Sequence, residues 1–322
     1  MSTKVLSTHK LPEEGLRKLR ESFDLLIPEG KHFSYQDLEE KIQDVEVLIP
    51  VFGFEINEQL IKKGKKLKII ANFGVGFNNI DVGAATRNKI VVTNTPKTVI
   101  EPTAELAFGL LLSLTRRITE LDHKLKNREE IKWEVMANLG HTLENKTLGI
   151  IGMGNIGKSF AQKARAFGMN VCYYSKERIS LSDEHLYQVA PVSFEYLIKE
   201  SDVISLHVPL TEETHHILDS EEFSKMKEGV YIINSSRGPV INEKALIEYI
   251  KNGKLGGAGL DVYEFEPKIS KELLEMEKVV LTPHIGTASL ETRIEMAREV
   301  SLNIMEFYKG EIPPNIVNPD VL

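Results

Sequence analysis

Short apolar runs and amphipathic helical patterns alternate along residues 1–101. Five runs have the length and turn-forming boundaries of buried strands: 5–8, 24–28, 45–51, 67–73 and 90–94. The segments between them repeat apolar residues at helical spacing, with Pro12 in a first turn and Ser34 and Asp81 as N-caps. This alternation predicts a parallel sheet with helices on both faces.

Residues 102–286 repeat the alternation on a larger scale. An apolar pattern over 104–125 predicts one long helix, whose stripe we interpret as core or as a subunit interface. Six further strands are predicted with helices between them: 148–152, 171–175, 202–208, 230–236, 256–262 and 279–284. Six parallel strands suit a complete dinucleotide-binding domain.

A glycine-rich turn follows the first of these six strands. The apolar residues 148–151 lead directly into Gly152, Gly154 and Gly157, after which a helical pattern begins and another strand follows. In this setting the first glycine permits the tight turn, the second lets backbone approach a pyrophosphate, and the third lets the helix pack on the strand. The helix N-terminus would direct N–H groups at the phosphates. The whole unit predicts a dinucleotide site rather than only a tight turn.

These patterns predict an α/β protein with two doubly wound parallel-sheet domains. A Rossmann-type dinucleotide-binding domain would span 102–286. Residues 1–101 lack the glycine fingerprint and would form a smaller, flavodoxin-like substrate (catalytic) domain. An amphipathic pattern at 290–308 lies beyond the second sheet, so we expect residues 287–322 to return to the first domain.

Composition narrows the range of partners. The chain has 322 residues, 42% of them hydrophobic, which is enough to bury substantial cores. A net charge of -7 argues against nucleic acid or an acidic membrane surface as the main partner. The one cysteine, Cys172, lies in a predicted strand and is interpreted as a small buried residue. Because a signal-peptide core is missing from the N-terminus, we expect a cytoplasmic protein, and we expect no metal site.

Three side chains with catalytic potential follow predicted strands of the second sheet. Arg237 comes after 230–236, Glu266 shortly after 256–262, and His284 ends 279–284. Taken singly, such residues are more often solvated or structural than catalytic. Because the carboxyl ends of parallel strands meet at one edge of a sheet, where the cofactor would also lie, we interpret the three as one set.

Seven ordered blocks give the sequence a resemblance to the D-isomer-specific 2-hydroxyacid dehydrogenase family over nearly its whole length. The blocks are NFGVGFNNID at 72–81, NTP at 94–96, GMGNIG at 152–157, HVPLTEETHHIL at 207–218, NSSRGPVINEKAL at 234–246, GLDVYEFEP at 259–267 and TPHIG at 282–286. This resemblance implies that Arg237, Glu266 and His284 are the catalytic arginine, glutamate and histidine.

The chemistry of 2-oxo acid reduction agrees with these implied roles. Hydride addition to a C2 carbonyl builds negative charge on its oxygen, which needs a proton donor and a fixed positive charge. His284 would donate the proton and Glu266 would orient its ring. Arg237 would offer a fork of donors to the substrate oxygens, a role that lysine fills less well. The expected product is a D-2-hydroxy acid.

The resemblance also implies substrate and cofactor contacts. The N–H groups of Val75 and Gly76 would bind the substrate carboxylate, and Val51 would line the substrate pocket. The implied cofactor contacts beyond the three glycines are Thr103, Asn155, Ile156, His207, Pro209, Thr214, Ser235, Ser236, Asp261 and Gly286. For Asp261, a turn cap is the alternative role.

The stretch after the second strand of the dinucleotide unit departs from the pattern of NAD-specific relatives. These carry an acidic residue there, which binds the ribose hydroxyls. In this sequence Ser175 takes its place, followed by Lys176, Glu177 and Arg178. The loss of a carboxylate beside two cations favours a 2′-phosphate, so we predict NADP(H), with NAD(H) as the alternative that Glu177 keeps open.

Substrate choice is less constrained by the sequence. Val51 stands where phosphoglycerate dehydrogenases resemble one another in having an arginine, and the pocket that Val51, Phe52 and Phe54 would line suits a small or modestly apolar 2-oxo acid. The chain resembles the glyoxylate/hydroxypyruvate reductase branch. The alternatives are a D-lactate or branched D-2-hydroxyacid dehydrogenase, a redox-sensing co-repressor on the same scaffold, and a flavin enzyme with the same fingerprint.

The family resemblance and the apolar helix pattern also imply a homodimer. Trp133, the one tryptophan, has two interpretations. It could reach an active site across a dimer interface, or it could be a simple packing residue.

Overall fold

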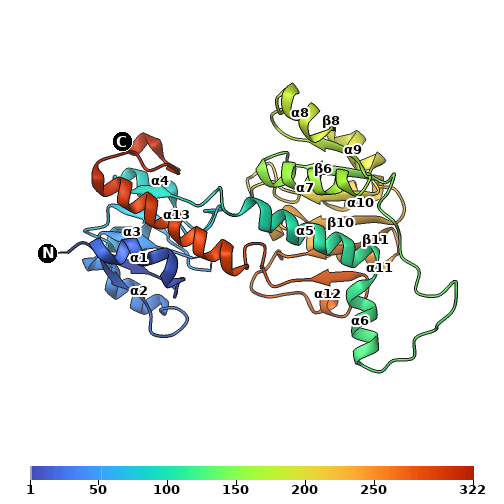
Figure 1. Cartoon of the computed structure of the whole chain (residues 1–322), viewed down its shortest axis with the longest axis horizontal. Coiled ribbons are helices and arrows are strands. Elements are labelled where there is room, and N and C mark those ends of the chain that lie inside the picture. The colour runs from blue at the N-terminus through green and yellow to red at the C-terminus, as the bar shows by residue number, and fades with distance from the viewer. Residues whose placement is uncertain (1, 52) are drawn as a thin grey trace. The chain divides into compact units, whose positions relative to one another are not determined.

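The computed structural model describes residues 2–51 and 53–322 and divides into two compact units (Figure 1). Unit 1 comprises Met1–Val99 and Thr287–Leu322, and unit 2 comprises Ile100–Gly286. Each unit is built on its own parallel sheet. The architecture is therefore α/β with two doubly wound sheets, as the sequence predicts.

The sheet of unit 1 has five strands in the order β2-β1-β3-β4-β5, which is the flavodoxin-like order. The strands are β1 Lys4–Ser7, β2 Asp24–Leu26, β3 Val47–Ile49, β4 Ile69–Ala71 and β5 Val91–Thr93. The helices are α1 Glu13–Ser22, α2 Tyr35–Lys41, α3 Glu58–Lys63, α4 Val82–Arg87 and α13 Leu290–Lys309, with 3-10 turns η1 Ile42–Asp44 and η3 Pro319–Val321.

Successive strand residues of unit 1 face opposite helix layers, because side chains alternate along a strand. In β3, Val47 and Ile49 pack with α1 and α13, whereas Leu48 packs with α2, α3 and α4. The predicted caps are confirmed: Ser34 forms a capping box with Asp37, and the Asp81 side chain accepts from Ala84 N. Pro12 is the N-cap residue of α1.

The sheet of unit 2 has seven strands in the order β12-β11-β10-β9-β6-β7-β8. The strands are β6 Thr147–Ile151, β7 Asn170–Tyr174, β8 Val189–Pro191, β9 Val203–Leu206, β10 Val230–Asn234, β11 Leu255–Leu260 and β12 Val279–Leu281. The helices are α5 Ile100–Thr115, α6 Ile118–Lys126, α7 Asn155–Ala166, α8 Leu181–Tyr187, α9 Phe194–Glu200, α10 Ser220–Lys225, α11 Glu243–Lys251 and α12 Lys271–Leu274, with the 3-10 turn η2 Gly238–Val240.

The prediction of six strands for this sheet is wrong by one, because β8 was missed. This edge strand has three residues, two of them exposed, and it ends at Pro191. Its apolar stretch in the sequence is short and contains a proline, which disfavours a strand, so the pattern did not mark it. Its place beside β7 completes the order of a Rossmann-type sheet. Cys172 is buried in β7, as predicted.

The prediction of one helix over 104–125 is also wrong. The helix is divided into α5 and α6 at Arg117, which has a left-handed backbone with φ of 55°. The Arg117 guanidinium binds Glu120 through two hydrogen bonds of 2.8 and 2.6 Å. Arginine is a good helix former, so the sequence carries no local signal for this break.

Trp133 lies in the segment after α6, and its relative exposure is 90%. The interpretation as a packing residue within this chain is therefore wrong. Among the residues that the structure describes, no helix is both long enough and apolar enough to span a bilayer.

The close packing of α1 on α13 gives a stability prediction for Gly15. A Cβ at this position would lie 2.4 Å from Ala297 Cβ and 2.6 Å from the Ile294 carbonyl oxygen. We expect Gly15→Ala to lower the free energy of unfolding by about 1–3 kcal/mol, because the two helices must move apart. Urea unfolding measures this difference.

Gly83→Ala in α4 is the matched control. Its Cβ would meet only the tip of the Arg87 side chain, at 3.3 Å, and the Asp81 side chain, at 3.5 Å. Equal unfolding free energies for the two variants would contradict the packing argument.

Candidate active site

The predicted cofactor residues of unit 2 gather at the carboxyl edge of its sheet. The glycine turn follows β6, Ser175, Lys176 and Arg178 follow β7, and His207 follows β9. Ser235 and Ser236 follow β10, and Asp261 follows β11. Gly286 lies beyond β12, where a Cβ would approach Thr103 of α5 at 3.4 Å. This is the edge at which open parallel sheets bind ligands.

The three glycines of the turn have three different surroundings. Gly152 has a φ of 96°, and its Cβ would lie 2.6 Å from the His207 carbonyl oxygen. A Cβ on Gly157 would lie 2.4 Å from the Gly152 carbonyl oxygen, so this position permits the close approach of α7 to β6. At Gly154 a Cβ would meet only open space. The first and third glycines are thus needed for packing, whereas the second leaves room for a ligand.

The donors around this open space fit a dinucleotide. Helix α7 begins at Asn155, and Ile156 is its second residue. No side chain caps its N-terminus, so its first N–H groups can bind phosphate. The hydroxyl of Ser235, at the end of β10, is buried without a hydrogen-bond partner among the described residues. Both features are consistent with a bound nicotinamide cofactor that supplies the missing acceptors.

His207, Pro209 and Thr214 lie on the loop after β9. The His207 ring packs against Phe160 at 5.0 Å between centroids and bonds Ser205 Oγ at 2.9 Å. Burial lowers the pKa of His207 to about 3, so its ring is neutral. Thr214 Oγ1 donates to the Pro209 carbonyl at 2.6 Å, which closes the loop on itself. The predicted contacts of these residues with a cofactor remain predictions.

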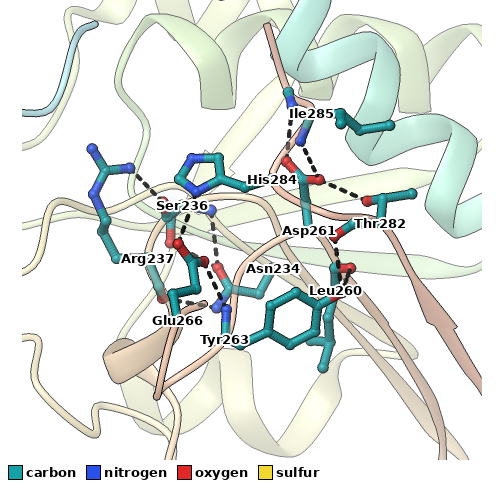
Figure 2. A network of polar contacts seen from close by, with 11 residues as sticks. Asn234, Ser236, Arg237, Leu260, Asp261, Tyr263, Glu266, Thr282, His284 and Ile285 are labelled. Carbon is teal, nitrogen blue, oxygen red and sulfur yellow. Dashed lines mark hydrogen bonds and ion pairs between the residues drawn. The ribbon is translucent and has the colours of Figure 1, made fainter. Parts of the chain in front are cut away.

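Glu266 and His284 form the central pair of the candidate site (Figure 2). His284 Nδ1 lies 3.0 Å from Glu266 Oε2, while Glu266 Oε1 accepts from the Tyr263 N–H at 3.0 Å. Burial acts to raise the pKa of Glu266, but the hydrogen bond and charge of His284, the Tyr263 N–H and the charge of Arg237 hold it below its ordinary value. The ionised carboxylate therefore accepts from Nδ1–H and fixes the ring.

The backbone of His284 is held by Asp261. His284 has a left-handed φ of 52°, which non-glycine residues rarely adopt. Asp261 Oδ1 accepts from Thr282 Oγ1 and from Ile285 N, both at 2.7 Å, and Oδ2 accepts from Gly286 N at 2.9 Å. Burial raises the pKa of Asp261 while these bonds favour its charged form. The structure thus shows the turn-cap role, and the cofactor contact of Asp261 stays a prediction.

Arg237 joins the pair from the end of β10 (Figure 2). Asn234 fixes its loop: Nδ2 donates to the Arg237 carbonyl at 2.9 Å, and Oδ1 accepts from Ser236 N at 3.0 Å. Burial lowers the pKa of Arg237, against the charge of Glu266. Within the described part of the chain Arg237 forms no ion pair, and its Nη1 donates only to the Ser236 carbonyl. A partly buried guanidinium without a carboxylate partner is suited to an anionic ligand.

Sequence reasoning missed the residues that support this site. Asn234 lies inside a predicted apolar strand, and Tyr263 contributes a backbone N–H and a hydroxyl that donates to the Thr282 carbonyl at 2.8 Å. Gly238 lies where a Cβ would be 1.8 Å from the Tyr263 carbonyl oxygen, which brings the Arg237 loop onto the Glu266 loop. The only sequence signal was that Asn234, Gly238 and Tyr263 fall within the family-like blocks.

The predicted substrate residues belong to unit 1. Val51 is buried with 6% exposure in a hydrophobic cluster, and its N–H donates to Thr8 Oγ1 at 3.1 Å. The Phe54 ring lies edge-on to His9, with 5.4 Å between centroids, and Phe52 lies outside the described residues. Val75 and Gly76 follow β4. Their roles toward substrate remain predictions.

The cations after β7 have partners that the sequence did not reveal. Arg178 forms two hydrogen bonds of 2.7 Å with Glu184, which also accepts from the Tyr173 hydroxyl at 2.6 Å. Lys176 Nζ lies 3.6 Å from Glu213. Glu184 sits in α8 and is almost fully buried, so it holds the Arg178 side chain in one orientation.

The Arg178 and Tyr173 hydrogen bonds lower the pKa of Glu184 from 4.5 to about 2. A carboxyl with a depressed folded pKa stabilises the protein fully above its ordinary pKa, and this contribution is lost as pH falls toward the folded value. We expect Glu184→Gln to be less stable than wild type at pH 7, with a difference that shrinks as pH falls below 4.5 toward 2. Chemical unfolding across this range tests it. Glu195→Gln, which removes an exposed pair with Lys199, is the control; a difference that grows at low pH would refute the assignment.

Comparisons with known proteins agree with this geometry. The family model for the NAD binding domain of D-isomer specific 2-hydroxyacid dehydrogenases matches residues 108–286. A glyoxylate reductase of Thermococcus litoralis is 44% identical over 100% of this chain and 98% of its own length. A solved structure from Thermus thermophilus has a TM-score of 0.92 at 36% identity and covers 98% of this chain and 100% of its own. A solved glyoxylate reductase from Paecilomyes thermophila has a TM-score of 0.88 at 35% identity, with 99% of each chain covered. The chain belongs to the D-isomer-specific 2-hydroxyacid dehydrogenase family, and it is a nicotinamide-dependent oxidoreductase.

Proposed function

We propose that this protein reduces glyoxylate, or a 2-oxo acid of similar size such as hydroxypyruvate, to the D-2-hydroxy acid. The observation that carries the proposal is the 3.0 Å contact between Glu266 and His284 beside Arg237, a cation that forms no ion pair in the described chain. An oriented acid and an unpaired cation are the two groups that reduction of a 2-oxo acid requires. Glyoxylate is proposed as the substrate because it is named for relatives that match the full chain.

Each of the three side chains has a separate task in this reaction. The reduced nicotinamide, when bound, supplies a hydride to the C2 carbonyl of the substrate. His284 donates its proton to the carbonyl oxygen as negative charge develops there, and Glu266 holds the ring in place through Nδ1. Arg237 binds substrate oxygen atoms through its fork of donors. The left-handed backbone of His284, held by Asp261, sets the ring direction.

We assign nucleotide binding to residues 102–286 and substrate carboxylate binding to residues 1–101 with 287–322. The glycine turn and its open space at Gly154 support the first assignment. The second rests on the family-like loop at Val75 and Gly76. We also propose a cytoplasmic homodimer, in which the exposed Trp133 lies at the contact with the second subunit.

We further propose that NADP(H) is preferred over NAD(H). Arg178 uses Nε and Nη2 on Glu184, which leaves the Nη1 end of its guanidinium for a ligand, and its side chain is 59% exposed. Lys176 is 87% exposed, with only a long contact to Glu213. These two cations would bind a 2′-phosphate.

Replacement of Arg237 tests the catalytic assignment. We expect Arg237→Ala to lower kcat/KM for glyoxylate, by an amount that corresponds to a loss of about 2–5 kcal/mol of transition-state stabilisation. The reason is that a desolvated charge contact to the substrate is lost. Arg237→Lys should recover only part of this loss, since an ammonium cannot form the planar fork. Steady-state kinetics with glyoxylate and hydroxypyruvate measures both. Arg20→Ala, which breaks an exposed pair with Glu13, is the control, and near-wild-type kinetics in Arg237→Ala would remove this residue from the mechanism.

Comparison of the two cofactors tests the nucleotide preference. Wild-type enzyme should show the higher kcat/KM with NADPH, and Arg178→Ala should reduce the NADPH/NADH ratio by about tenfold, because a charge-assisted contact to phosphate is removed. Lys199→Ala removes an exposed lysine of the same unit and should leave the ratio unchanged. A wild-type enzyme that prefers NADH would defeat the proposal.

A further inference from the structure

We propose that Asn72 is the positioning residue that shapes the substrate-carboxylate receptor of unit 1. Its side-chain amide holds the carbonyl groups of Gly74 and Gly76, and so directs the backbone N–H groups of this loop toward an anion. The inference rests on the proposed function, because it assigns a carboxylate to the loop at Val75 and Gly76.

The carbonyl oxygens of Gly74, Val75 and Gly76 all accept hydrogen bonds from residues of unit 1. Asn72 Nδ2 donates to the Gly74 oxygen at 3.0 Å and to the Gly76 oxygen at 2.9 Å. Asn94 Nδ2 donates to the Val75 oxygen at 2.8 Å, and Thr95 N also donates to Gly74 at 3.1 Å. Asn72 has an exposure of 2%, so water cannot readily replace its amide. Three consecutive acceptors are therefore held in place.

The N–H groups of the same loop have no such partners. Among residues 2–51 and 53–322, none accepts a hydrogen bond from the N–H of Gly74, Val75 or Gly76. In a planar trans peptide the N–H points opposite to the carbonyl of the preceding residue. The amide that holds the Gly74 carbonyl thereby aims the Val75 N–H away from Asn72. A loop with fixed acceptors and unpaired donors is a receptor for an anion rather than for a cation.

The charge beside this loop has the sign that an anion requires. The Arg293 guanidinium lies 5.8 Å from the ring centre of Phe73, the residue directly before Gly74. Burial lowers the pKa of Arg293, yet an arginine remains protonated at neutral pH. Within the described chain Arg293 forms no ion pair, so its charge is not neutralised by a carboxylate. Its field favours a negatively charged ligand at the neighbouring N–H groups.

The side chain at position 72 must combine two properties. It needs a nitrogen that carries two N–H donors, because the Gly74 and Gly76 carbonyl oxygens both accept from Nδ2. It must also be neutral, because a positive charge there would compete for the anion. Aspartate has the same shape but only acceptors, and alanine leaves both carbonyls free to turn. An asparagine meets both requirements at this site.

Two variants, Asn72→Asp and Asn72→Ala, test the proposal in the full-length protein. We expect KM for glyoxylate and the inhibition constant of oxalate, a dicarboxylate that cannot be reduced, to rise together by roughly tenfold or more, with a smaller fall in kcat. The dissociation constant of NADPH should be unchanged, since its proposed site is built from unit 2. Asn88→Ala is the matched control, because Asn88 Nδ2 makes one bond of 2.8 Å to the Ala84 carbonyl at the end of α4. If Asn72 had only a structural role, its replacement would change the melting temperature but would not weaken carboxylate binding while leaving NADPH binding unchanged.

The outcomes separate the inference from the proposed function. Wild-type KM and oxalate inhibition in a folded Asn72→Asp protein that still binds NADPH would overturn the role of Asn72 and leave the reductase assignment intact. A wild-type protein that reduces no 2-oxo acid would overturn the proposed function instead. If both variants fail to fold, a crystal structure of the wild type with oxalate decides. The inference requires a carboxylate within hydrogen-bond distance of Val75 N and Gly76 N, with Asn72 still bonded to both carbonyls, and any other arrangement overturns it.

Discussion

The buried carboxylate of Asp261 is the constraint on which the geometry of the site in unit 2 depends. Its oxygens accept three hydrogen bonds from the turn that carries His284, at 2.7 to 2.9 Å. These bonds offset the cost of removing the carboxylate from water and hold His284 in a left-handed backbone conformation. The imidazole consequently faces Glu266. A side chain in a sparsely populated backbone conformation needs such support, because its own loop would relax without it.

Asn234 is a second buried polar side chain that fixes a loop, in this case the loop that carries Arg237. Asn234, at the end of β10, binds backbone groups of Ser236 and Arg237, and Gly238 packs directly on the Tyr263 carbonyl. The Arg237 and Glu266 loops are therefore fixed against each other by backbone contact. In unit 1, Asn72 makes the equivalent kind of contact with the loop after β4. In both sheets, a buried polar side chain near the end of a strand holds a loop that contains proposed site residues.

Local pattern was sufficient for most of the fold and for the choice of candidate catalytic residues. Strands and helices have different periods, and the order of the elements selects parallel sheets. The spacing of Gly152, Gly154 and Gly157 after a buried strand predicted the nucleotide turn: the first and third glycines permit close packing, and the second lies beside open space. Arg237, Glu266 and His284 could be chosen because parallel strands bring their ends together, and the family-like blocks gave the three their roles.

Tertiary structure decided what depends on partners distant in the sequence. Strand β8 is defined by its pairing with β7, since its own three residues are too few to mark a strand and include a proline. The sequence identified Arg178 as a cation after β7, but only the fold shows that Glu184 from α8 binds it. The role of the Asn72 amide becomes visible only in the folded loop, where the Gly74 and Gly76 carbonyl groups both accept from its Nδ2. The sequence alone determined most of the elements that form and which residues are candidates for catalysis. Only the fold determined which polar groups meet, because a hydrogen bond depends on distance and direction in space and not on separation along the chain.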